Sequence, residues 1–132
     1  MSIDSIANFL TIIRNGVMVS KSFVTAPYSK MRHSIAQILK EEGFITDFVI
    51  LNADSDAKKT LKIVLKYVDG EAVIHEIQRI SKPGRRVYAG NQEIKPVIGQ
   101  LGISILTTSR GVIANQNAKK LSVGGEVICT VW

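Results

Sequence analysis

The stretch GISILTTSRGVIANQNAKKLSVGGEVICTVW, residues 102–132, decides most of the fold. Its first apolar run, GISILTT, predicts a strand with Ile103 and Ile105 on one side. The segment NQNAKKL has room for a short helix only, and we expect Asn115 to cap it because the side chain of Ala114 accepts no backbone hydrogen bond. The glycines of VGG then interrupt the chain before a last strand, EVICTVW. Together these elements predict a mostly β region with one short helix.

The N-terminal half alternates helical and extended patterns. Apolar residues recur at helical spacing over residues 3–18, which predicts an amphipathic helix. KSFVTAP is short and extended, and Ser29 suits the N-cap of a second helix that ends at Gly43. FITDFVIL and TLKIVLKYV follow as two strands, and the polar loop NADSDAKK between them predicts a hairpin. The first lobe is therefore expected to run helix, strand, helix, strand, strand.

The segment DGEA, residues 69–72, is the best candidate for a linker. After it, VIHEIQRIS predicts a strand, KPGRR a turn and VYAG a short extended piece. We therefore expect an α+β protein of two small lobes. Residues 1–70 form the N-terminal lobe, and residues 71–132 form a mostly β C-terminal lobe with one short helix.

The charge of the chain favours a polyanionic partner. Its 132 residues carry a formal net charge of +6. Residues 71–132 hold eight Lys and Arg against four Asp and Glu, a net charge of +4, whereas residues 1–70 carry +2. Cys129 is the single cysteine, so the chain has no internal disulfide framework. No apolar run approaches the ~20 residues that span a bilayer, and the N-terminus lacks the pattern of a secretion signal, so we expect a soluble protein.

The sequence gives an enzyme little support. His33 and His75 lie far apart in sequence, and Cys129 lies in an apolar strand, where a cysteine usually serves as a small core residue. Paired-cysteine zinc spacing, His-Glu-x-x-His, a Walker phosphate loop and GxSxG are all absent from the sequence. We therefore expect no catalytic residues, no metal site and no cofactor.

Three hydroxyl side chains at the end of GISILTT favour a recognition site instead. Thr107, Thr108 and Ser109 are followed by Arg110 and Gly111, and we expect the chain to lead from there into the helix. Hydroxyl groups both donate and accept, so they can bond to ribose hydroxyls, phosphates and base edges. A plainer interpretation stays open, in which the threonines are ordinary strand residues and the serine closes a turn.

A second candidate lies in RISKPGRRVY. Lys82, Arg85 and Arg86 are close in sequence to a Pro-Gly turn, which would hold their charges together, with no acidic residue among them. Tyr88 follows and could stack on an unpaired base, although a place in the core is the alternative. Gly124 and Gly125 are also open to a plain role as a turn before the last strand.

These motifs resemble, over essentially the whole chain, the bacterial-type family of the small-subunit ribosomal protein number eight. The most specific piece is residues 102–132, and RISKPGRRVY, IANFLTIIRNG and PYSKMRHSIAQILKEEGFI also match. The family signature is matched by Gly102, Ile105, Leu106, Thr107, Thr108, Gly111, Val112, Ile113, Ala118 and Lys119. Four positions depart from the family pattern: Thr107 stands where Ser is usual, Ala114 where Thr is usual, Ser5 where Pro is common and Gly16 where Ala is common.

The resemblance implies a two-lobed structural constituent of the small ribosomal subunit. It implies direct binding to the central domain of small-subunit ribosomal RNA early in assembly, with neighbouring small-subunit proteins as further partners. It implies no membrane and no small-molecule substrate. The expected location is the cytoplasm, in the small subunit, with an organellar ribosome also open. A free-standing nucleic-acid-binding or regulatory module with the same fold is the alternative.

The resemblance also implies which residues contact the RNA. The C-terminal lobe would make the principal contacts and the N-terminal lobe a secondary one. The principal residues are Arg85, Arg86, Tyr88, Thr107, Thr108, Ser109, Arg110, Gly111, Gly124, Gly125 and Glu126. Arg14, Asn15 and Lys30 are the weaker candidates in the N-terminal lobe. The carboxylate of Glu126 could accept a hydrogen bond from a base amino group, or it could cap the backbone of its own turn.

Overall fold

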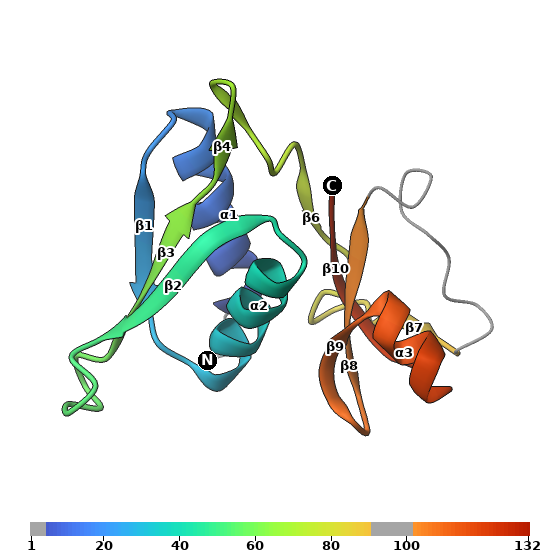
Figure 1. Cartoon of the computed structure of the whole chain (residues 1–132). Coiled ribbons are helices and arrows are strands. Elements are labelled where there is room, and N and C mark those ends of the chain that lie inside the picture. Colours follow the sequence, from blue (N-terminus) through green and yellow to red (C-terminus); the bar gives the residue numbers. More distant parts are fainter. Residues whose placement is uncertain (1–4, 91–101) are drawn as a thin grey trace. The chain divides into compact units, whose positions relative to one another are not determined.

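The structure is a computed structural model that describes residues 5–90 and 102–132 (Figure 1). The chain divides into two compact units, Ser5–Ile74 and His75–Trp132. Helices and strands occur in both, and the strands described pair antiparallel, so the predicted α+β class is confirmed.

The unit Ser5–Ile74 is a three-stranded sheet covered on one face by two helices. Its elements are α1 (Ser5–Met18), β1 (Phe23–Pro27), α2 (Lys30–Glu41), β2 (Ile45–Leu51) and β3 (Thr60–Leu65). The strands pair antiparallel in the order β1-β3-β2. On β3, Leu61, Ile63 and Leu65 alternate with less buried residues and pack toward the helices, whose Phe9 and Ile35 are fully buried. The predicted order of helix, strand, helix, strand, strand is therefore confirmed for the described residues.

Local sequence signals set the ends of α2. The hydroxyl oxygen of Ser29 accepts a hydrogen bond from the backbone N–H of Arg32 at 3.1 Å, as an N-cap does. Gly43 follows the C-cap residue with φ +83°, a left-handed conformation that glycine adopts without a steric penalty. Both predicted ends are confirmed. The predicted first turn of α1, with Ile3 and Asp4, lies outside the described residues.

The segment around residues 66–72 differs from its predicted form. The strand expected over residues 60–68 ends at Leu65, and β4 (Tyr67–Val68) pairs with β5 (Glu71–Ala72) in a separate hairpin. The expected linker DGEA includes the turn of this hairpin, in which Asp69 and Gly70 have φ values of +53° and +77°.

The unit His75–Trp132 is built around its last strand. Its elements are β6 (Ile77–Arg79), β7 (Tyr88–Ala89), β8 (Ile103–Thr108), β9 (Gly111–Ala114), α3 (Asn115–Leu121) and β10 (Gly125–Val131). The sheet order is β6-β10-β8-β9, and β7 also pairs with β10. Leu106 and Ala118 are fully buried where α3 packs on the sheet, and Ile105 and Cys129 are fully buried as cross-strand partners.

Three expectations for this unit were wrong. The strand expected over residues 73–81 is reduced to β6, because the N–H groups of His75 and Glu76 both donate to the carbonyl of Trp132. The residues after the hydroxyl run form β9 and not a lead into the helix. Asn115 does not cap α3: Ala114 is the N-cap residue without a side-chain bond, and the buried Asn115 accepts through Oδ1 from the N–H of Ser104 at 3.1 Å.

Candidate nucleic-acid interface

The start of β10 brings together side chains from three strands. Glu126 pairs with Thr107 of β8 on one side and with Tyr88 of β7 on the other. Directly opposed residues in antiparallel strands share one face of a sheet. Thr107, Glu126 and Tyr88 therefore form a row across β8, β10 and β7, which we name the cross-strand row. The side chain of Tyr88 is not part of the core, since the residue is 67% exposed.

The hydroxyl run forms the tip of a hairpin between β8 and β9. Thr108 pairs with Gly111, which leaves Ser109 and Arg110 as an exposed two-residue loop. The hydroxyl of Thr108 donates to the carbonyl of Gly111 at 2.9 Å and accepts from the N–H of Arg110 at 3.0 Å. Gly111 has φ +102°, which any other residue adopts only with strain.

The three adjacent hydroxyls therefore differ in what they can offer a ligand. The hydroxyl of Thr108 is engaged in closing its own turn. Within the described residues, the hydroxyls of Thr107 and Ser109 have no hydrogen-bond partner. The hydroxyl of Thr107 belongs to the cross-strand row, and that of Ser109 lies at the exposed tip. These two groups are free to bond to a ligand.

Strands β8 and β10 approach so closely at Gly125 that only a glycine fits there. A Cβ atom at this position would collide with the backbone carbonyl oxygen of Thr107. Gly125 lies opposite Thr108 and Ala89, so the glycine lets β8 and β7 flank β10 closely at the level of the hairpin tip. The neighbouring Gly124 is half-buried and precedes the strand.

The cationic segment forms a closed loop beside β10, which we name the 81–87 loop. The N–H and carbonyl groups of Lys82 and Arg85 bond reciprocally at 2.9 Å, which makes the tight turn that the sequence predicts. At its base, the fully buried hydroxyl of Ser81 accepts from the N–H of Val87 at 2.9 Å and donates to the carbonyl of Val87 at 3.2 Å. Ser81 and Val87 also bond to the backbone of Val127 in β10. The exposed residues 82–86 are thus held at both ends.

Glu126 has a partner that the sequence did not indicate. Its carboxylate accepts from the guanidinium of Arg86 at 3.0 Å, and its side chain is only 15% exposed. Arg86 is therefore oriented toward the cross-strand row, whereas Arg85 has no ion pair among the described residues and is exposed. The interpretation of Glu126 as a backbone cap has no support in this arrangement.

The structure brings most of the predicted residues into one unit. All eleven principal candidates lie in His75–Trp132, on β7, β8, β9, β10 and the loops that join them. The weaker candidates lie in Ser5–Ile74: Arg14 and Asn15 on the last turns of α1, and Lys30 at the exposed start of α2.

Ser81 and the hairpin partner Val112 were missed by the sequence analysis. Val112 extends the cross-strand row onto β9 as the partner of Thr107. Ser81 could have been found from its place immediately before the Lys-Pro-Gly turn. The burial of its hydroxyl has no signal in the sequence.

The described residues contain few groups suited to catalysis. No cluster of three or more His, Cys, Asp or Glu residues that could hold a metal ion is present within residues 5–90 and 102–132. Burial raises the pKa of the Cys129 thiol to about 12, which keeps the sulfur protonated and unreactive near neutral pH. Among the same residues, no helix is both long and apolar enough to cross a membrane.

Comparison with known proteins gives one consistent result. The family model described as Ribosomal protein S8 matches residues 4–132. Three relatives, each named Small ribosomal subunit protein uS8, come from Marinobacter nauticus, Solibacter usitatus and Teredinibacter turnerae. The first and third are 50% identical over 129 residues, which cover 98% of this chain and 97% of each relative. The second is 48% identical over 133 residues and covers both chains completely.

Proposed function

The chain belongs to the Ribosomal protein S8 family, and on this premise we propose that it is a structural constituent of the small ribosomal subunit that binds small-subunit ribosomal RNA directly. The proposed site is the start of β10 with the loops on its two sides, and the proposed target is the central domain of the RNA. The observation that carries this site is the cross-strand row of Thr107, Glu126 and Tyr88, which lies between the hairpin tip and the 81–87 loop.

The two sides of the site suit two parts of an irregular RNA helix. Such RNA exposes ribose hydroxyls in its shallow groove and bases that have left the stack. The free hydroxyls of Thr107 and Ser109 suit the former, and the exposed ring of Tyr88 suits an unpaired base. Lys82 and Arg85 supply charge for phosphates. Hydroxyls and the ring would provide selection, and the cations would provide affinity.

We also propose an unequal division of labour between the two units. The principal contacts would come from His75–Trp132, since the row, the tip and the 81–87 loop lie there. Arg14, Asn15 and Lys30 of the other unit would make a secondary contact. An isolated but folded N-terminal unit that bound the RNA as tightly as the whole chain would contradict this division.

The experiment is a titration of the full chain against a transcript of the central domain and an unrelated transcript of equal length, with a chemical footprint of the first complex. We expect clear preference for the central domain. Tyr88→Ala should weaken that binding by about 1–3 kcal/mol through lost stacking. Gln116→Ala is the control, because Gln116 is exposed on α3, which is not part of the row. Equal binding of both transcripts, or no effect of Tyr88→Ala, would contradict the proposed site.

A free-standing regulatory module is the second candidate function, and the amount of the chain in ribosomes separates the two. A structural constituent must be present at near one copy per purified small subunit. A regulatory module would be found mainly outside the subunits. Neither role requires catalysis, and we propose that the chain is not an enzyme.

A further inference from the structure

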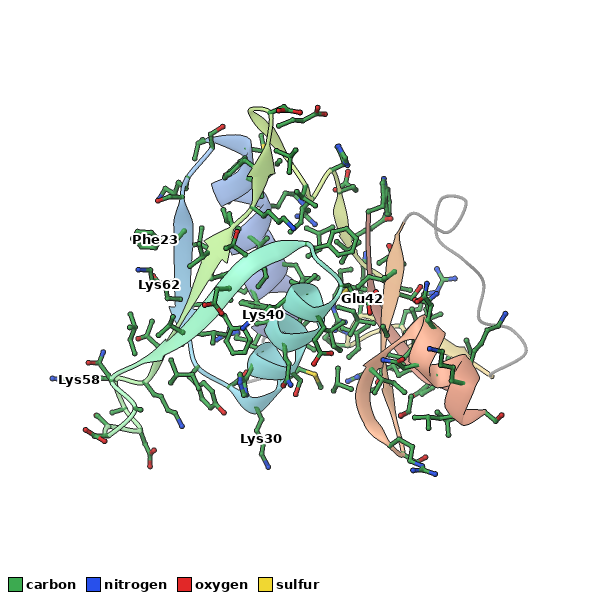
Figure 2. All side chains as sticks on the ribbon, in the orientation of Figure 1. Phe23, Lys30, Lys40, Glu42, Lys58 and Lys62 are labelled. Carbon is green, nitrogen blue, oxygen red and sulfur yellow. The ribbon has the colours of Figure 1, made fainter. Side chains whose placement is uncertain are left out.

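The sheet of the unit Ser5–Ile74 has a second face that α1 and α2 do not cover. On β3, the residues that alternate with the buried ones are Thr60, Lys62 and Val64. The strand register places Phe23 beside Val64, and Thr25 and Val49 on the two sides of Lys62. The same register adds Pro27 and Leu51 beside Thr60, and Asp47 beside Val64. We name this side of the sheet the outer face; its residues are Phe23, Thr25, Pro27, Asp47, Val49, Leu51, Thr60, Lys62 and Val64. Figure 2 shows Phe23 and Lys62 projecting together away from the helices.

The outer face exposes three large apolar side chains to water. Phe23, Val49 and Leu51 are 44%, 43% and 38% exposed, and each lies in a different cross-strand row of the same sheet face. Scattered exposed apolar residues are ordinary, but here Val64 of β3 lies between Phe23 and Val49 and joins them into one group, which is typical of an interaction site. Exposed side chains on both outer strands therefore indicate a surface that another molecule covers.

A single positive charge lies in the middle of this apolar surface. The ammonium group of Lys62 is 4.3 Å from the centre of the Phe23 ring, which holds it over the outer face. Within the described residues, Lys62 has no acidic partner. The one acidic residue of the outer face, Asp47, is already paired with Lys40 of α2 at 3.0 Å. The positive charge of Lys62 is therefore not balanced within the described residues, and an acidic group of a partner could balance it.

The chemistry of the outer face suits a protein better than RNA. Protein interfaces have an aromatic and aliphatic centre with few charges, which matches Phe23, Val49 and Leu51. The candidate RNA site on the other unit has free hydroxyls and grouped cations in place of aliphatic residues. A hollow at one end of the outer face can accept a side chain, and its lining includes Pro27, Ala57, Lys58 and Lys59. The two lysines there add to the positive charge that an acidic partner would meet.

We propose that the outer face is a docking surface for a neighbouring protein of the small subunit, which presents an acidic side chain to Lys62 and apolar side chains to Phe23 and Val49. This inference rests on the proposed place of the chain in that subunit. It is separate from the proposed RNA site, and it does not use Arg14, Asn15 or Lys30, which lie on the two helices.

The test is photo-crosslinking from the outer face in assembled subunits. Val49 is replaced by benzoylphenylalanine in the full chain, subunits containing it are purified and irradiated, and the cross-linked product is identified by mass spectrometry. We expect a cross-link to one protein, at a peptide that contains Asp or Glu. Lys62→Glu should lower the yield about tenfold, and changing the mapped acidic residue to Lys should restore it.

Two controls separate docking from damage to the fold. Lys62→Met keeps most of the side-chain stem and removes only the charge, so it should lower the yield without lowering the melting temperature. The photoreactive group at Gln37, exposed on α2, should give a yield that Lys62→Glu leaves unchanged.

The remaining outcomes overturn the inference. A cross-link from position 49 to RNA would make the outer face an RNA surface. The inference would also be wrong if subunits that contain the chain gave no protein cross-link, or if neither change at Lys62 altered the yield. Both results would leave the proposed function intact. Absence of the chain itself from purified subunits would overturn the proposed function and this inference together.

Discussion

The hairpin tip and the 81–87 loop flank the same strand, and a hydroxyl group closes each of them. At the tip, the hydroxyl of Thr108 bonds to the backbone of Arg110 and Gly111. In the 81–87 loop, the hydroxyl of Ser81 bonds twice to the backbone of Val87. The tip exposes a hydroxyl and one cation, whereas the 81–87 loop exposes three cations. In both loops the hydroxyl is bonded to the backbone, so the side chains beside it are the ones left to bond to a ligand.

Gly125→Ala should have the largest effect, because it disturbs both loops at once. The new Cβ would collide with the carbonyl of Thr107, and the strand pairs on both sides of β10 would have to shift. We expect the free energy of unfolding to fall by about 1–3 kcal/mol, and specific RNA binding to be largely lost. Urea denaturation and RNA titration measure the two effects.

Gly124→Ala is the control for this change, since Gly124 lies just outside the strand. It should have a smaller effect on both quantities. If Gly125→Ala bound the RNA like the parent, the close approach of the strands would be irrelevant to recognition.

Ser109→Ala should separate the tip from the 81–87 loop. Ser109 is exposed and its hydroxyl has no partner in the described residues, so the change should leave stability unaltered. It should weaken binding to the specific RNA by about 1–3 kcal/mol, because an RNA group would lose its hydrogen bond in the complex. The salt dependence of binding should stay the same, since no charge is removed.

Thr108→Val provides the contrast at the tip. It keeps the branched shape and deletes the hydroxyl that closes the turn. We expect it to lower stability by about 1 kcal/mol and to affect RNA binding less than Ser109→Ala. If Thr108→Val lowered RNA affinity more than Ser109→Ala, the proposal that Thr108 closes the turn while Ser109 contacts the RNA would be wrong.

Arg85→Ala should weaken binding to RNA in general and leave the preference for the specific RNA unchanged. Its side chain is exposed and unpaired in the described part of the chain, so it is suited to a phosphate. We expect several-fold weaker binding to specific and unrelated RNA alike, and a log-log salt slope that falls by about 0.7–0.9. Arg86→Ala should change the slope less, because Glu126 already neutralises that guanidinium. A larger slope change for Arg86→Ala would show that the ion pair opens on binding.

Cys129→Ala should have the smallest effect on binding, because the residue lies in the core away from both loops. We expect unchanged RNA affinity and a loss of about 1 kcal/mol in stability.

Burial raises the thiol pKa from 9.0 to about 12, so the folded state keeps a proton that the unfolded state releases. The stability that this provides is complete below pH 9 and is lost as the pH rises toward about 12. Unfolding measured across this range should therefore show a steeper decline for the parent than for the variant.

Sequence reasoning succeeded where the cause of a structure is local. Ser29 and Gly43 end α2 through contacts within a few residues, and the Pro-Gly turn closes on itself. Asn115 was misassigned because its preferred partner, the N–H of Ser104, lies eleven residues away. The four-residue strand β9 has too short a pattern to be distinguished from the helix that follows it.

The candidate site shows the same division. The resemblance supplied its residues, and nothing in the sequence distinguished Thr108 from Ser109. That distinction depends on the turn geometry at Gly111, whose left-handed conformation brings its carbonyl within reach of Thr108. The pairing of Glu126 with Arg86 likewise depends on β10 and the 81–87 loop, because the two residues are forty positions apart in the chain.

The closure of the 81–87 loop has a consequence for how such proteins diversify. One buried hydroxyl already joins the two positions that flank residues 82–86, and β10 holds both. The entropic cost of closing a loop rises only slowly with the length of the loop, by about 0.6 kcal/mol for each doubling. Insertions, deletions and charge changes between these two positions should therefore leave β6 and β7 in place. We therefore expect that a related chain can change the charges it exposes at residues 82–86 while its sheet stays the same.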